Sequence, residues 1–278
     1  MPIPERRPSA GVRWSVAVAV ASAFVALAGF GAIWLGGSGS PGGDAPEVAV
    51  AASSNAAVPV MATTPAAPPP PTTPPAPVLR VDGPVPATGK GRFAYATTAG
   101  PVLGTAGTLR RFRVAVEAEA QEQPNEFAAL VDQVLGDRRS WIAGRGVRFQ
   151  RTAAANADFT IYLATPGTAG QLCLRGGVNI RVGGTPYTSC RVGAKVVINL
   201  ARWRLSVPEY VAAKTPLINY RQYVLNHEVG HFLGHGHERC PQRGRPAPVM
   251  QKQTLGLDGC VANAWPYVGG KRHTGPPL

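Results

Sequence analysis

The sequence predicts an α+β domain in which helices cover a mixed, twisted sheet and one long helix carries the functional site. Three observations support this fold class. Alternating apolar residues typical of strands recur from about residue 90 onward, a helical segment separates the first two of these stretches, and a long helical segment follows the last. Residues 1–89 do not share this pattern, so we place the domain at residues 90–278.

Residues 14–35 predict a transmembrane helix that acts as a signal anchor. This stretch carries no charge, and its length of about 22 residues corresponds to about 33 Å of helix, which is enough to cross a hydrocarbon core. Trp14 and Trp34 lie near its two ends, where amphipathic rings favour the membrane interface. The arginines within residues 1–13 place that segment in the cytoplasm and the remainder of the chain outside the cell membrane.

A cleavable signal peptide is the alternative for this region. Its apolar stretch is usually shorter, about 7–15 residues, which favours the uncleaved anchor. Residues 26–28 and residues 49–51 both have the small-x-small pattern of cleavage sites. In either case the C-terminal domain is exported, either as a single-pass membrane protein or as a secreted one.

Residues 36–89 predict a disordered linker rich in Ala, Pro and Thr. The segment lacks the apolar side chains that would offset the entropy lost on folding. The proline run at residues 68–71 favours a stiff, extended chain. We therefore expect a spacer that holds the domain away from the membrane.

The first elements of the domain follow directly from the residue pattern. Residues 109–117 alternate in polarity and predict a strand. Residues 124–135 predict a helix with an apolar face, and Gly136 ends it. Residues 146–150 and 158–163 predict two further strands.

Between the third strand and the long helix the pattern is weaker. Residues 166–194 are rich in glycine and predict a looped excursion with a short strand near residues 178–182. Residues 195–200 predict another strand, because they form a short apolar run that contains β-branched residues.

The four cysteines all lie in the C-terminal part of the chain, and an even number in an exported domain suggests two disulfides. Three connectivities are possible, and we favour pairing between sequence neighbours. This gives Cys173–Cys190 and Cys240–Cys260, each of which closes a loop of about 20 residues and contributes about 3 kcal/mol. Four free thiols are the alternative.

The net charge of +13 arises entirely from the C-terminal part of the chain. Residues 80–278 hold 25 Lys and Arg against 12 Asp and Glu. A basic domain attracts anionic surfaces, and an anionic cell-envelope polymer is a possible partner for an exported one. No nucleic-acid recognition motif is present. A basic surface without a specific partner explains the same numbers.

The long helix is expected to run from Pro216 to Leu233, with Thr215 as its N-cap. His227 and His231 are four residues apart, so both imidazoles project from one face and can bind one metal ion. Glu228 lies about 100° around the helix from His227, beside the metal, where a general base is needed.

Gly234 ends this helix because glycine adopts the left-handed conformation that other residues resist. The chain can then reverse and bring His237 to the metal as a third ligand. Three imidazoles leave one position of a tetrahedral zinc ion open for water, which is typical of a catalytic site. The sequence therefore predicts one catalytic Zn²⁺ on His227, His231 and His237.

The pattern His227-Glu228-x-x-His231-x-x-Gly234-x-x-His237 matches the full signature of the metzincin zinc metallopeptidases. Met250, within Pro248-Val-Met-Gln, resembles the methionine turn of that superfamily, which places an apolar floor under the ligands. The region from residue 220 to residue 268 also resembles an uncharacterised family of exported actinobacterial proteins that carries a metzincin-like signature.

The resemblance implies a zincin-like fold and an extracytoplasmic endopeptidase with Glu228 as the general base. Its substrate would be a protein or peptide lying along an edge strand of the sheet. Two positions depart from some members of the superfamily. Lys252 stands where astacin-like and serralysin-like enzymes carry a metal-binding tyrosine. Glu238 follows the third histidine, as in astacin-like enzymes.

Two other functions are compatible with the same residues. One is a catalytically silent module that keeps zinc for stability and binds a cell-wall polymer or a partner. The other is a zinc amidase that acts on cell-wall peptides. The presence of Glu228 argues against the silent module, because a structural zinc site has no need of a general base.

Overall fold

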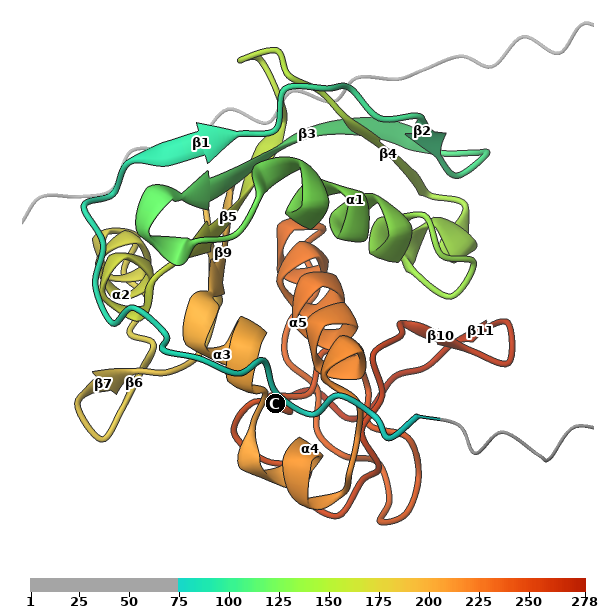
Figure 1. The fold of residues 1–278 in the computed structure, drawn as a ribbon. Coiled ribbons are helices and arrows are strands. Elements are labelled where there is room, and N and C mark those ends of the chain that lie inside the picture. The colour runs from blue at the N-terminus through green and yellow to red at the C-terminus, as the bar shows by residue number, and fades with distance from the viewer. Residues whose placement is uncertain (1–74) are drawn as a thin grey trace, which may run out of the picture. The chain divides into compact units, whose positions relative to one another are not determined.

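The centre of the fold is a seven-stranded mixed sheet, seen in a computed structural model that describes residues 75–278 (Figure 1). The expected cytoplasmic segment 1–13, the transmembrane helix 14–35 and most of the linker 36–89 lie outside the described residues. Within residues 75–278, no helix combines the length and the apolar composition that crossing a membrane requires.

The sheet has the strand order β2-β4-β3-β5-β9-β8, with β1 pairing to the second half of β3. Its core is parallel, because β4, β3, β5 and β9 run in one direction, while β1, β2 and β8 are antiparallel to their neighbours. The strands are β1 (Phe93–Tyr95), β2 (Val102–Leu103), β3 (Thr108–Glu117), β4 (Val147–Arg151), β5 (Phe159–Ala164), β8 (Cys190–Val192) and β9 (Lys195–Asn199). The predicted mixed sheet is thus confirmed.

Five α-helices accompany the sheet in the described part of the chain. They are α1 (Pro124–Leu135), α2 (Pro166–Arg175), α3 (Leu200–Leu205), α4 (Pro208–Ala212) and α5 (Leu217–Phe232). The remaining elements are the 3₁₀ turns η1 (Ala118–Ala120) and η2 (Trp141–Gly144) and the small hairpins β6 (Arg181–Val182) with β7 (Thr185–Pro186) and β10 (Tyr267–Val268) with β11 (Lys271–Arg272).

The two faces of the sheet are covered by different helices. Phe112 and Val114 of β3 belong to the main core, which α1 and α5 complete on one face (Figure 1). Val197 of β9 points the other way, into a smaller core that contains Cys173 of α2. The alternation of side chains along each strand produces this division, as expected for a sheet with both faces buried.

The glycine-rich segment 166–194 is not the looped excursion that the sequence predicts. It begins with α2, and the expected strand near residues 178–182 is limited to Arg181–Val182 of β6. Small residues suit a helix that packs closely, since a Cβ atom on Gly170 would lie 2.9 Å from the Pro186 ring. Gly167 and Gly170 thus serve close packing of α2, whereas Gly177, Gly183, Gly184 and Gly193 have positive φ angles and form turns as the sequence predicts.

The long helix begins one residue later than predicted, and Thr215 is not its N-cap. α5 starts at Leu217, and the N-cap is Pro216, which has no side-chain acceptor. The backbone N–H of Leu217 donates instead to the carbonyl of Val78, at 2.8 Å. A segment far away in the sequence therefore satisfies the helix terminus, which local sequence signals do not reveal.

Both predicted disulfides are confirmed. Cys173–Cys190 joins α2 to β8, the strand at the edge of the sheet, with Cα atoms 6.1 Å apart. Cys240–Cys260 joins the segment after His237 to the segment after Met250, with Cα atoms 5.8 Å apart. The first bridge lies within the smaller core beside α2, and the second joins two irregular segments.

Candidate metal centre

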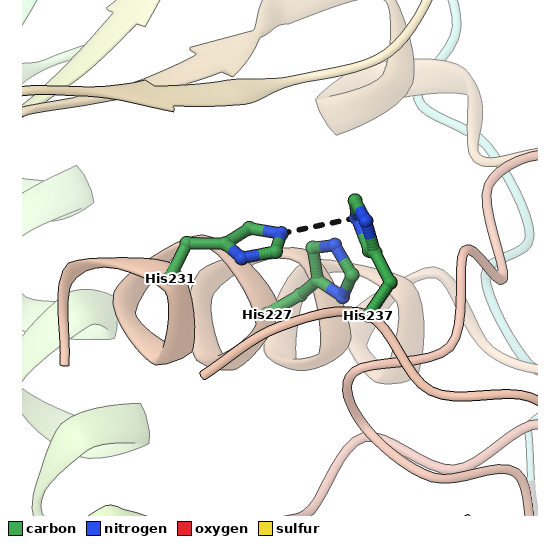
Figure 2. Close-up of side chains that lie close together, drawn as sticks. All are labelled: His227, His231 and His237. Atoms are coloured by element: carbon green, nitrogen blue, oxygen red, sulfur yellow. Dashed lines mark hydrogen bonds between the residues drawn. The ribbon is translucent and has the colours of Figure 1, made fainter. Parts of the chain in front are cut away.

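Three histidine side chains converge on one point beside α5 (Figure 2). His227 and His231 project from the same face of the helix, with ring centroids 4.7 Å apart. The Nε2 atoms of His231 and His237 are 3.1 Å apart. One nitrogen from each of the three rings lies within 4.8 Å of the others, a spacing that permits binding to a single metal ion.

The chain reversal that brings in His237 depends on the end of α5. Leu233 caps the helix, and Gly234 follows with a φ of +94°, a conformation that residues with a Cβ atom rarely adopt. The N–H of His235 then donates to the carbonyl of Gly230 at 3.0 Å, which closes the turn. The expected role of Gly234 as a helix-ending residue is met by this geometry.

Hydrogen bonds fix the orientation of two of the three rings. Nδ1 of His227 lies 2.8 Å from the carbonyl oxygen of Val249, and Nδ1 of His231 lies 2.8 Å from that of His235. Because a carbonyl oxygen can only accept, each Nδ1 bears the proton and each Nε2 presents a lone pair toward the shared point.

Burial keeps the three imidazoles neutral. Desolvation lowers the pKa of His227 to about 3 and that of His237 to about 4, and it also lowers the pKa of His231. A metal ion binds the neutral imidazole, so at neutral pH these side chains are in the state that a metal requires.

Glu228 lies next to this group and has no partner for one of its carboxylate oxygens. The side chain is only 5% exposed, and Oε2 accepts no hydrogen bond from the described residues. Burial raises the pKa of Glu228 to about 8. Most buried polar atoms in proteins are satisfied, so this oxygen indicates a group that the protein itself does not supply.

Met250 and Gly230 account for the close packing behind the histidines. Met250 is fully buried, and a Cβ atom on Gly230 would lie 2.5 Å from its Sδ and 2.6 Å from the Trp141 ring. Gly230 stands on α5 between His227 and His231. Met250 therefore packs directly against the helix segment that presents the two ligands, and no sequence motif points to Gly230.

His235 is not part of the three-histidine group. Its ring stacks on Trp141 with centroids 4.4 Å apart and an interplanar angle of 13°. This contact fixes the residue whose carbonyl orients His231. Trp141, which comes from a distant part of the chain, is not identified by the sequence pattern.

Three tyrosines connect α5 and α4 to the segment that follows Met250. The hydroxyl of Tyr210 donates to Gln253, that of Tyr220 lies 3.0 Å from Oγ1 of Thr254, and that of Tyr223 donates to the carbonyl of Gln251. All three rings are fully buried. Their three hydrogen bonds hold the segment that follows Met250 at a defined position beside α5, and they thereby position Met250.

The three histidines open into a cavity of about 610 Å³. Glu228 lines it as well, and α5 forms its base. One wall is the segment from Thr188 to Arg191, which includes the start of the edge strand β8, and another is the segment from Lys252 to Leu255. A cavity of this size beside a candidate metal centre has room for a bound ligand.

The arrangement fits a bound divalent metal ion. Three neutral imidazole nitrogens suit zinc among other first-row transition metals, and the side chain of Glu228 lines the same cavity. Within residues 75–278, no other group of at least three His, Cys, Asp or Glu has this spacing.

Comparison with known proteins gives a family but no activity. A family model described as "Protein of unknown function (DUF3152)" matches residues 79–267, which include all three histidines and Glu228. No curated protein and no solved structure matches.

Proposed function

We propose that this chain, which belongs to the DUF3152 family, is an extracytoplasmic zinc-dependent endopeptidase of the metzincin type. The observation that carries the proposal is the convergence of His227, His231 and His237 in one cavity with the unpaired carboxylate of Glu228. The resemblance of the same residues to the metzincin signature points to the same chemistry.

The three histidines would hold the zinc ion through their Nε2 atoms. When bound, zinc supplies a Lewis acid that lowers the pKa of a water molecule to about 7 and polarises a carbonyl group. The carbonyl oxygens of Val249 and His235 keep the rings of His227 and His231 in the tautomer that this binding needs. Met250 packs under the helix and would keep the ligands from shifting.

Glu228 would move the proton. As a carboxylate it would accept a proton from the attacking water, and it would then give the proton to the leaving nitrogen. The buried position suits this role, because a carboxyl group with a pKa near neutral can both accept and release a proton.

The edge strand β8 would bind the substrate backbone. β8 pairs with β9 on one side only, so its other side presents backbone groups that an extended peptide can pair with. The Cys173–Cys190 bridge anchors the first residue of this strand. A peptide on β8 would pass over the cavity that contains the histidines, because Cys190 and Arg191 both line it.

The test is a Glu228→Ala variant of the full chain with its zinc content measured by mass spectrometry. We expect zinc to stay bound and hydrolysis of casein to fall at least 10²-fold, the usual loss when a general base is removed. Hydrolysis at the wild-type rate by a zinc-loaded Glu228→Ala protein would remove Glu228 from the mechanism.

The same assay separates the two other functions that the sequence allows. A zinc amidase would release products from cell-wall fragments but not from casein, and a chelator would stop it. A silent zinc-stabilised binding module would cleave neither substrate while keeping its metal. The unpaired Oε2 of Glu228 favours the two enzymes over the module, because a structural site gains nothing from an unsatisfied buried carboxylate.

A further inference from the structure

Two cations line the cavity, one on each of two walls. Arg191 belongs to β8, and Lys252 follows Met250 by two residues. Neither side chain forms a salt bridge or a hydrogen bond with any described residue. Arg272, by contrast, is paired with Glu238.

The direction of Arg191 follows from the register of the sheet. Arg191 pairs with Val196 of β9, whose side chain belongs to the main core on the side of α5. The preceding residue, Cys190, pairs with Val197 and points to the opposite face, where α2 lies. Alternation along the strand therefore turns Arg191 toward the histidines. Its Nε is buried and has no partner among the described residues.

Lys252 stands at the other wall and is exposed to solvent. Arg191, Lys252 and the three histidines all line the same cavity. Both cations therefore face the space into which the three rings open.

The cavity offers these two cations no counter-ion. Among its lining residues Glu228 is the one acidic side chain, and it lies buried in α5, away from any salt bridge. A concave site that carries two unpaired positive charges concentrates a field that favours anionic ligands. The unpaired guanidinium is the stronger element, because it can bind a carboxylate through two parallel hydrogen bonds.

We infer that the cavity selects peptides that carry a carboxylate close to the bond to be cleaved, with Arg191 and Lys252 binding that carboxylate. The hydrolysis in this inference rests on the proposed function, but binding of the carboxylate does not require hydrolysis. The carboxylate has two possible sources, an Asp or Glu side chain within the peptide or the carboxylate at a peptide's C-terminus.

The experiment measures binding separately from hydrolysis. The full chain with the Glu228→Gln substitution is loaded with zinc and titrated by calorimetry with short, blocked, alanine-rich peptides. The peptides differ at one position, which is Glu, Gln or Lys. A fourth peptide has Gln at that position and a free C-terminal carboxylate in place of the amide. This fourth arm separates a chain end from a side chain as the source of the charge.

We expect the Glu peptide to bind about tenfold more tightly than the Gln peptide, as a charge-assisted hydrogen bond provides, and the Lys peptide to bind more weakly than both. The preference for the Glu peptide over the Gln peptide should decrease as the salt concentration is raised. If the free C-terminus gives the same gain as the Glu side chain, the site recognises chain ends as well.

The double variant Arg191→Gln/Lys252→Gln, made in the same background, should reduce the ratio of the two affinities to about one. The matched control is Arg138→Gln/Lys195→Gln, which removes two exposed cations that do not line the cavity and should keep the preference. Zinc content is measured for every variant, so that loss of the metal is recognised.

Three results would overturn the inference. They are no measurable binding of the Glu peptide, equal affinity for the Glu and Gln peptides, or a preference that survives the Arg191→Gln/Lys252→Gln change, since zinc itself would then be holding the carboxylate. A protein with intact Glu228 that binds the Glu peptide preferentially but hydrolyses no peptide would contradict the proposed function and leave this inference standing.

Discussion

Gly230 is the residue whose role is clearest from packing alone. Met250 and Trp141 occupy the space that a side chain at this position would need, and Gly230 lies between two candidate ligands on α5. Sequence reasoning identified the three histidines, Glu228 and Gly234 because their spacing is local and follows from helix geometry. It could not identify Gly230 or Trp141, because their partners come from other parts of the chain.

A Gly230→Ala substitution should destabilise the protein by about 1–3 kcal/mol, the usual cost of overpacking a filled core. Urea unfolding of the zinc-free protein measures this change. Gly236→Ala is the matched control, since nothing lies within 4 Å of the Cβ position there and the change should have little effect. Equal stability of the two variants would show that Met250 and Trp141 can move aside.

The buried histidine predicts a pH dependence for the metal-free protein. The pKa of His227 is lowered from 6.5 to about 3 by burial, so between these values the unfolded chain binds a proton that the folded chain does not. Stability contributed by the neutral ring is therefore complete above pH 6.5 and is lost as the pH falls toward 3.

Urea unfolding in the presence of a chelator, at about pH 7.5 and about pH 4.5, tests this sign. Between these two pH values, the wild-type protein should lose stability relative to a His227→Gln variant, because glutamine does not titrate. The raised pKa of Glu228 favours the folded state at the lower pH in both proteins, so the difference between the two proteins is the quantity that reports on His227. An identical change in both proteins would assign the pH dependence to other groups.

At the scale of elements, prediction succeeded where the pattern is periodic and local. The residues of β3 and α1 and the position of α5 follow from alternation and helical spacing. The glycine-rich helix α2 was not predicted, because its small residues are explained by close packing against distant parts of the chain and not by a local pattern. Helices α3 and α4 were not predicted either, since each is too short to show a period.

The two disulfides should differ in their effect on function. Replacing Cys173 and Cys190 by alanine frees the edge strand β8, so we expect kcat/KM for peptide hydrolysis to fall while zinc stays bound. Replacing Cys240 and Cys260 frees the segments that carry His237 and Met250, so zinc affinity should fall as well.

Removing either disulfide should also lower the free energy of unfolding by about 3 kcal/mol. Metal analysis and peptide kinetics on both variants provide the comparison, and the same effect on zinc from both would contradict this assignment.

The last residues of the chain brace the third ligand. The N–H of Leu278 donates to the carbonyl of His237, the N–H of Arg239 donates to that of Pro276, and Glu238 accepts from Arg272 and from the N–H of Gly275. These contacts hold the segment around His237 from the side opposite α5. They also give Glu238 a structural role that its position after the third histidine did not reveal.

Deleting residues 274–278 should therefore weaken zinc binding about tenfold, which is the usual effect of removing a group that orients a metal ligand. Competition with a zinc-binding dye measures the affinity. The control is Thr274→Ala, which changes an exposed residue of the same segment and leaves its backbone contacts intact. Unchanged affinity in the truncated protein would show that the turn after Gly234 positions His237 without this support.

For the whole molecule, the structure describes the C-terminal domain, and the expectations for the N-terminal residues rest on the sequence alone. Residues 75–278 form the mixed sheet and the candidate metal centre, while the expected membrane anchor and most of the linker lie outside the described residues. The predicted arrangement is a spacer that carries the domain away from the membrane. On this account the cavity faces extracytoplasmic peptides, and its two unpaired cations select among them.

The central claim is that three imidazoles hold one zinc ion, and X-ray absorption at the zinc edge of the purified full chain tests it most directly. We predict one zinc per chain, with three nitrogen neighbours at about 2.0–2.1 Å and one oxygen neighbour, and one nitrogen fewer in a His237→Ala variant. A wild-type spectrum with sulfur neighbours, or one that the His237→Ala change leaves unaltered, would contradict the claim.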